Sequence, residues 1–489
     1  MDEARLGIRK GGNTRMSLKP RWWENATMMH FTSPKHKGRS LKQMIGLVDE
    51  LKEWGFNAIC MGIPYHGGIQ YSGLDVLDYY TVDPALGTMD DFDELVTTCH
   101  DSDIAVTAFL NLGYAAAEFP PFLQACDDVK AGVDSPESRW FVWSDTKSAE
   151  LDRSQVPFFL NDVEVNSSSW QFSERAGKYH WVRWRGRTGD EDLPQFDYGA
   201  ESWQQECRRV VRFWMDKGID GIMVDAVPEY TNCNWEANNS TITDVVHEYP
   251  NTFVLPEGAG IRSDPVAWIT DGHYDSVQDY GIRDSRIGRR WGQAVRLALE
   301  CGNPTGIEIK LRLYRDRVVK AGGVTWARVM GSWGSGDGGG PALRVMGDTT
   351  GNLSPAQMLL EVATLATVGE LFVASDRIFE PMWSTWFLSR HKKMMKARQK
   401  YPALCAMGSR RRLPTNNDGR YYAFLRASTT DNEMLLVVLN FQNEDAMIEV
   451  NLDWEAELVD IFSGKRQKVE KTLELPLPPY GYSIFEVHR

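Results

Sequence analysis

The chain has 489 residues, a formal net charge of −13 and an apolar fraction of 42%. This length exceeds one ordinary core, so we expect a large domain with a smaller one, or a barrel with insertions. The acidic balance argues against nucleic-acid and anionic-membrane partners, and no apolar run is long enough to span a membrane.

The ends and the unusual residues of the chain set further bounds. Residues 1–20 are basic and polar without the apolar core of a signal peptide, so we expect a flexible N-terminal segment and a cytoplasmic protein. The 7 cysteines are scattered without a CxxC pair, which is typical of reduced thiols and indicates neither a zinc site nor a disulfide framework. The 18 tryptophans fit either core packing or stacking against sugar rings.

Helical and strand patterns alternate along most of the chain. Residues 40–54 place their apolar side chains on one helical face, and Gly55 ends the predicted helix. Strands and helices then continue to alternate at residues 57–62, 92–102, 104–110, 208–225 and 242–257. This order indicates parallel strands joined by helical crossovers.

Two segments depart from this alternation. Residues 113–194 are rich in Pro, Trp, Ser and charge, and predict a subdomain inserted after the third strand. Residues 403–489 contain short alternating runs separated by polar turns, which predict an antiparallel β sandwich. The fold class is therefore α/β, a (β/α)₈ TIM barrel built from residues 21–112 and 195–402.

Two apolar strands of the predicted barrel each end in a carboxylate. Residues 218–227 contain a glycine turn and a strand that ends at Asp225, and residues 253–257 repeat this pattern at Glu257, about one βα unit later. Barrel strands deliver catalytic groups at their carboxyl ends. Two carboxylates facing one pocket is the arrangement that breaks glycosidic bonds.

The chain resembles the alpha-amylase family, family 13 of the glycoside hydrolases, and within it the oligo-1,6-glucosidase and trehalose synthase branch. The stretches that carry the resemblance are residues 22–26, 78–92, 140–145, 213–221, 227–233 and 248–250. The resemblance implies that Asp225 is the nucleophile and Glu257 the general acid/base. It also implies a small-molecule carbohydrate or sugar-like substrate and no cofactor.

Most other signature positions of that family are replaced. Met223 stands where the family has an Arg that keeps the nucleophile ionised, and Leu74 stands where a Tyr stacks under the sugar. The strand that ends in Asn-His in the family reads here as residues 109–114, with Asn111 and Tyr114 as pocket candidates. We expect these residues to line a rebuilt substrate pocket.

The third carboxylate and the missing cation have candidate replacements. The third-carboxylate region falls near Trp333, and Asp337 in the glycine-rich stretch 334–340 either loops back into the pocket or lies on a surface loop. Arg328 and Arg262 are candidates for the missing Arg. The loop that holds calcium in this branch contains basic residues at 35–37, so we expect no metal.

Three functions fit this pattern. The first is a retaining glycosidase or transglycosidase whose pocket is rebuilt for a substrate other than an ordinary α-glucan. The second is a non-catalytic binding protein of the same fold, and the third is a barrel reused for other acid/base chemistry, with groups such as Asp279 and Tyr280 in its pocket. We favour the first because both carboxylates are kept at the strand ends. The oligomeric state is left open.

Overall fold

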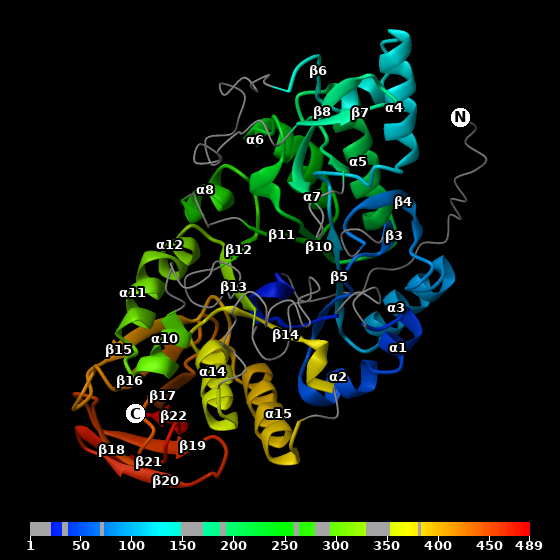
Figure 1. Ribbon diagram of the computed structural model, residues 1–489. Coiled ribbons are helices and arrows are strands. Elements are labelled where there is room, and N and C mark those ends of the chain that lie inside the picture. The colour runs from blue at the N-terminus through cyan, green and yellow to red at the C-terminus, as the bar shows by residue number, and fades with distance from the viewer. Residues whose placement is uncertain are drawn as a thin grey trace.

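The computed structural model describes residues 21–31, 38–68, 73–147, 170–185, 192–258, 264–278, 294–328, 353–379 and 383–489. Its centre is one 8-stranded sheet whose paired strands are all parallel, in the order β11-β10-β5-β2-β1-β14-β13-β12 (Figure 1). Asp275 closes the ring, because its backbone N–H, just before β12, donates to the carbonyl of Val254 in β11 at 3.1 Å. The predicted barrel is confirmed.

The eight barrel strands are short and buried. They are β1 (Thr27–His30), β2 (Ala58–Cys60), β5 (Ala105–Leu110), β10 (Gly221–Val224), β11 (Phe253–Pro256), β12 (Ser276–Gln278), β13 (Val324–Arg328) and β14 (Leu371–Ser375). Alternate residues point inward and fill the ring with side chains such as Met28, Phe109 and Trp326. Gly221 lets β10 and β11 approach, since an added Cβ would lie 2.1 Å from the carbonyl oxygen of Phe253.

Helices surround the barrel on its outer face (Figure 1). They include α1 (Leu41–Ile45), α2 (Val48–Trp54), α3 (Met89–Asp101), α5 (Glu201–Asp216), α6 (Trp235–Asn238), α7 (Asp244–His247), α8 (Pro265–Thr270), α10 (Ala294–Cys301), α11 (Thr305–Leu313), α12 (Arg315–Lys320), α14 (Pro355–Thr367) and α15 (Thr385–Lys400). The single helix predicted at 40–54 is two helices, because the chain turns at Gly46, a residue with low helix propensity. Thr88 and Asp91 form the capping box that begins α3.

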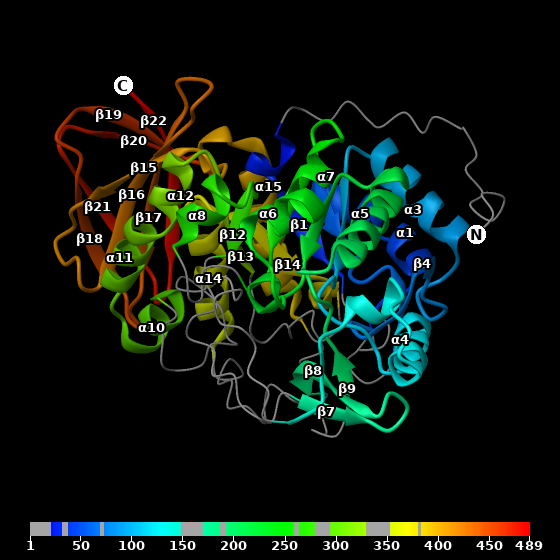
Figure 2. The ribbon, with the colours of Figure 1, turned by 90° about the horizontal axis from the view of Figure 1, so that it is seen from above.

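Two excursions lie above the strands' carboxyl ends. A hairpin of β3 (Tyr65–Gly67) and β4 (Val76–Val82) follows β2. The insertion between β5 and α5 contains α4 (Pro120–Ala131) and the antiparallel strands β6 (Trp143–Ser144), β7 (Trp170–Ser173), β8 (Lys178–Arg185) and β9 (Asp192–Pro194). Figure 2 shows these strands at one edge of the molecule, well away from the C-terminal sheets. An insertion after the third barrel strand is therefore confirmed.

The C-terminal part is an antiparallel sandwich, as predicted. A 6-stranded sheet in the order β15-β16-β17-β22-β19-β20 packs with the β18-β21 pair around one apolar cluster. The strands are β15 (Ser409–Leu413), β16 (Tyr421–Ala427), β17 (Met434–Asn440), β18 (Ala446–Asn451), β19 (Ala456–Asp460), β20 (Arg466–Val469), β21 (Thr472–Leu477) and β22 (Tyr482–His488). The domain boundaries at residues 20, 112, 194 and 402 remain predictions.

The tryptophans serve mainly as core side chains. Trp203, Trp214, Trp268 and Trp326 are among the largest fully buried residues of the described chain. Trp203 stacks on Phe196 with ring centroids 3.6 Å apart, where the end of the insertion meets α5. Of the two interpretations of the tryptophan content, core packing accounts for these residues.

Candidate active site

The two strand-end carboxylates lie side by side at the carboxyl end of the barrel. Asp225 follows β10, and its N–H donates to the carbonyl of Leu110 in β5 at 2.8 Å. Glu257 follows β11, and its N–H donates to the carbonyl of Val224 at 2.7 Å. Since Val224 pairs with Pro256, the next residues of the two strands are register neighbours. Both side chains are largely buried, with exposed fractions of 7% for Asp225 and 5% for Glu257.

The backbone N–H of Ala226, the residue after Asp225, contacts the carboxylate of Glu257. The N–H of Ala226 donates to Oε2 of Glu257 at 3.1 Å. Ala226 has φ 41° and ψ 37°, in the left-handed region that non-glycine residues rarely adopt. Strained backbone of this kind concentrates at functional sites. The turn after Asp225 therefore aims a donor at Glu257.

Three tyrosines interact with Asp225, one by a hydrogen bond and two through its charge. Tyr114 donates from its hydroxyl to Oδ2 of Asp225 at 3.2 Å. Burial raises the pKa of Tyr65 well above its usual value, and the negative charge of Asp225 raises it further. The same two causes, in the same order, raise the pKa of Tyr230. These two phenols therefore stay protonated and neutral near a buried carboxylate, and the hydroxyl of Tyr65 donates to the carbonyl of Leu74 at 3.1 Å.

The residue at the expected Arg position contributes no polar group to Asp225. Met223 is fully buried inside the barrel, with Phe109 and Leu255 as its register neighbours. Leu74 joins the same apolar cluster, and its carbonyl accepts from Tyr65 and Asn111. The floor below Asp225 is therefore apolar where the resembled family is polar.

Asn111 shapes the loop that carries Tyr114. Its Oδ1 accepts from the N–H of Gly113 at 2.8 Å and of Tyr114 at 3.4 Å, and its Nδ2 donates to the carbonyls of Leu74 and Tyr114 at 2.7 and 2.8 Å. The side chain is fully buried. Asn111 thus fixes the loop that carries Tyr114, and the contact with substrate that the sequence suggests for it stays a prediction.

Several predicted site residues fall outside what the structure describes. Trp333, Asp337 and Arg262 are in this group, as are the basic residues 35–37, Asp279 and Tyr280. Arg328 ends β13 opposite Val373, but its side chain is not among those described. The roles suggested for these residues remain predictions.

Sequence reasoning missed other polar groups at this end of the barrel. Asp75 directly precedes β4 and is fully buried. Burial raises the pKa of Tyr65 most, and the charges of Asp225 and Asp75 raise it further. The signal was present, since Asp75 keeps the last position of the family's Gly-Tyr-Asp motif. His30, Gln278 and Ser375 end β1, β12 and β14 as buried polar residues, which is the same strand-end pattern that identified Asp225.

The described segments contain neither a metal-binding cluster nor a membrane-spanning helix. Within them, no group of three or more His, Cys, Asp and Glu side chains is arranged to hold a metal ion. No helix there combines the length and apolar character needed to cross a bilayer.

Comparisons with known proteins define the class. The family described as "Alpha amylase, catalytic domain" matches residues 31–257, and "Maltogenic Amylase, C-terminal domain" matches residues 411–484. Both carboxylates, Asp225 and Glu257, lie within the first match. The chain is thus similar to the alpha-amylase family over residues 31–257, and to the C-terminal domain of maltogenic amylases over residues 411–484.

Individual relatives are distant. The trehalose synthase/amylase TreS of Mycobacterium tuberculosis is 27% identical over 277 residues, covering 53% of this chain and 44% of that protein. A glucan 1,6-alpha-glucosidase of Streptococcus pneumoniae is 22% identical over 301 residues, covering 60% and 48%. The chain thus matches about half the length of these curated relatives.

Solved structures agree on the fold. The trehalose-6-phosphate hydrolase of Bacillus licheniformis superposes with a TM-score of 0.71 at 15% identity, covering 96% of this chain and 100% of the other. Amy13B of Eubacterium rectale also gives 0.71 at 16% identity, covering 95% and 96%. At such low identity the likeness concerns the fold alone.

Proposed function

We propose that the protein is a retaining glycoside hydrolase or transglycosidase whose substrate is a glycoside other than an ordinary α-glucan. The observation that carries this proposal is the pairing of Asp225 and Glu257 at adjacent strand ends, with the Ala226 N–H bound to Glu257. Relatives named as a trehalose synthase/amylase and a glucan 1,6-alpha-glucosidase support the same reaction class.

The reaction has two steps. In the first, a carboxylate oxygen of Asp225 bonds to the anomeric carbon while the glycosidic C–O bond breaks, and Glu257 gives its proton to the departing oxygen. In the second, Glu257 takes a proton from water or an acceptor hydroxyl. That oxygen bonds to the anomeric carbon, and the bond to Asp225 breaks. Two inversions leave the anomeric configuration unchanged.

The apolar side chains near Asp225 support the proposal of a substrate other than an ordinary α-glucan. Met223 and Leu74 offer no polar side-chain atom to a sugar hydroxyl or to the nucleophile. Each charged contact that is lost from a buried site costs on the order of 1.5–3 kcal/mol. A substrate gripped mainly through those contacts, as an ordinary glucosyl unit is in this family, would therefore react slowly here.

The test compares the wild type with Asp225→Asn and Glu257→Gln on a panel of glycosides that includes starch, maltose and trehalose. We expect little turnover of those three, and turnover of another glycoside with retention, read by NMR of the first-formed anomer. Both variants are expected to lose several orders of magnitude in kcat, with nearly unchanged melting temperature. Brisk maltose hydrolysis would overturn the substrate assignment, and full activity in both variants would overturn the glycosidase assignment.

A further inference from the structure

Tyr114 occupies a buried position that the surrounding chain fixes from several sides. Its exposed fraction is 1%. The next two N–H groups, of Ala115 and Ala116, donate to the carbonyls of Pro194 in β9 and Val76 in β4 at 2.9 and 3.0 Å. On the other side, the carbonyl of Gly113 accepts from the N–H of Phe196 at 2.9 Å. The segment is thus held between the β3–β4 hairpin and the end of the insertion.

The turn before Tyr114 is fixed as well. Asn111 satisfies the N–H and the carbonyl of Tyr114 with its own side chain, at 3.4 and 2.8 Å. A tyrosine has only two side-chain torsions, so a fixed backbone leaves its hydroxyl few positions. The hydroxyl is therefore presented to Oδ2 of Asp225 by the loop's own geometry.

This hydrogen bond lies where the nucleophile needs support. A carboxylate enclosed by apolar side chains tends to take up a proton, and a donor to its ionised form opposes that tendency. Met223, two residues earlier on the same inward face of β10, supplies no donor for the role. Tyr114 supplies one at 3.2 Å.

We propose that Tyr114 is a positioning residue that helps to keep Asp225 ionised and oriented, through the hydrogen bond from its buried hydroxyl. The inference rests on the proposed function, because it assigns Tyr114 to the nucleophile. The phenol keeps its own proton throughout the reaction. Because it bonds to the nucleophile, its loss acts on kcat and on the pH profile more than on KM.

The kinetic experiment uses the glycoside from the panel above that the wild type turns over with retention. We expect Tyr114→Phe to lower kcat by about tenfold or more, the scale of a hydrogen bond to a charged group, and to move the acid limb of the kcat/KM profile to higher pH. Tyr198→Phe is the matched control, since it deletes an equally buried hydroxyl whose partners are the carbonyl of Leu112 and the Sγ of Cys207. We expect the control to keep the wild-type acid limb.

Two kinetic outcomes would overturn the inference. One is an acid limb that stays in place in Tyr114→Phe. The other is a limb that moves in Arg328→Met but not in Tyr114→Phe, because Arg328 would then supply the charge. An activity that survives Asp225→Asn would instead overturn the proposed function, so the two failures are distinguishable.

A measurement that needs no substrate decides the inference independently. Denaturant unfolding of the wild type, Tyr114→Phe, Asp225→Ala and the double variant gives their coupling. At pH 7 we expect a coupling of about tenfold in the unfolding equilibrium constant, which shrinks as acid protonates the carboxylate. Absence of coupling at pH 7 would show that the hydroxyl does not support ionised Asp225.

Discussion

At the scale of single residues, the backbone at Ala226 joins the two halves of the candidate active site. Its left-handed conformation, with φ 41°, points its N–H at Glu257 immediately after the chain has placed Asp225. In residues other than glycine, this conformation is destabilised by close contact between Cβ and the backbone. The site therefore depends on a local strain that the rest of the barrel holds in place.

Substitutions at Ala226 test this dependence. Ala226→Gly is expected to keep or raise the melting temperature and to keep activity, because glycine adopts this conformation without steric cost. Ala226→Val adds a branched Cβ and is expected to cost about 1–2 kcal/mol of unfolding free energy, with a matching loss of kcat as Glu257 shifts. Thermal unfolding and turnover of the two variants provide the measurement. Equal behaviour of glycine and valine would contradict the role given to this backbone.

At the scale of elements, two crossed His–Asp pairs tie α7 to the loop before β12. Asp244 of α7 bonds His273 at 2.8 Å, and His247 of α7 bonds Asp275 at 3.0 Å. Oδ2 of Asp275 also accepts from the N–H of Val254 in β11 at 2.9 Å. The pairs thus fasten the helix to the start of two barrel strands, far from the catalytic end.

The pair of His247 and Asp275 predicts that the stability of the protein depends on pH. The hydrogen bond to Asp275 raises the pKa of His247; burial opposes the rise, and the charges of Asp275 and Asp244 add to it. A pKa that is higher in the folded state gives stability that is fully present below the unfolded value of about 6.5 and is lost as the pH rises through the folded value. His247→Gln should therefore destabilise the protein most near about pH 6 and progressively less in alkaline buffer.

Thermal unfolding of the wild type and His247→Gln across this pH range measures the effect. Asp275→Asn is the companion variant, since it removes the charge that holds the proton while keeping an oxygen that can accept from Val254. We expect His247→Gln to have little pH-dependent effect in that background. A difference between wild type and His247→Gln that stays constant with pH would contradict the assignment.

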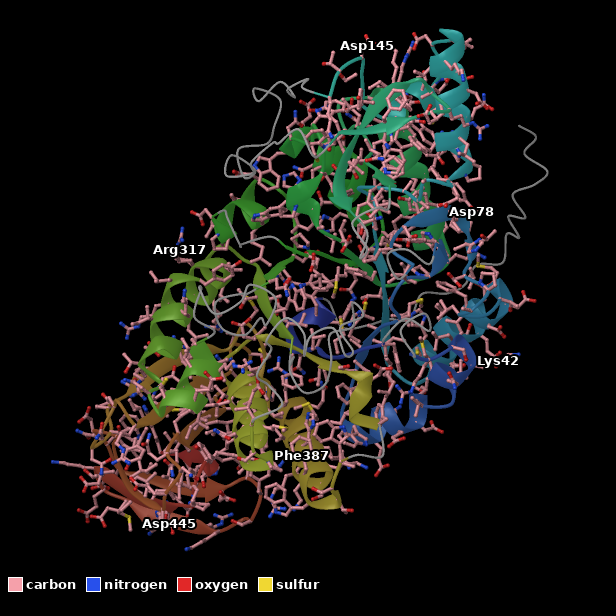
Figure 3. The ribbon with its side chains drawn as sticks, viewed as in Figure 1. Lys42, Asp78, Asp145, Arg317, Phe387 and Asp445 are labelled. Atoms are coloured by element: carbon pink, nitrogen blue, oxygen red, sulfur yellow. The ribbon has the colours of Figure 1, made fainter. Side chains whose placement is uncertain are left out.

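At the scale of the whole molecule, the insertion and the sandwich lie on opposite sides of the molecule in Figure 3, where Asp145 and Asp445 mark them. Buried arginines secure the sandwich. Arg426 of β16 donates to the carbonyls of Ala403, Val368 and Cys405 at 3.0, 3.2 and 2.5 Å. One side chain of the sandwich therefore donates hydrogen bonds to carbonyls in the turn after α14 and in the turn that leads into β15.

Arg426→Met is expected to weaken this junction. It removes a donor from three carbonyls, of which that of Cys405 still accepts from the N–H of Gly408 at 3.2 Å, at a cost of about 1–3 kcal/mol for each that is left unpaired and that water does not reach. We expect a lower melting temperature and easier proteolysis at the junction. Arg466→Met, which removes an exposed ion pair with Glu457 within the sandwich, is the control and is expected to change stability little. An Arg426→Met protein as stable as this control would show that the junction rests on apolar packing instead.

Local pattern alone determined much of the architecture. The alternating runs predicted within residues 403–489 form antiparallel strands such as β18 and β21, whose residues are alternately buried and exposed, because alternation of apolar and polar residues reports which side of a sheet faces the core. Asp225 and Glu257 were identifiable for a related reason, since each directly follows a short apolar strand that closes a helix–strand unit. The order of those units was sufficient to predict a parallel barrel, and the motifs were sufficient to predict the family.

Only the tertiary structure placed the hydroxyl of Tyr114 against Asp225. Tyr114 and Asp225 are 111 positions apart, and their hydrogen bond depends on the Asn111 turn, on β9 of the insertion and on the β3–β4 hairpin. The sequence indicated that the expected Arg was missing and pointed to other arginines. It could not reveal a phenol as the donor, because the direction of a side chain in a loop is set by contacts with remote segments and leaves no periodic trace in the chain.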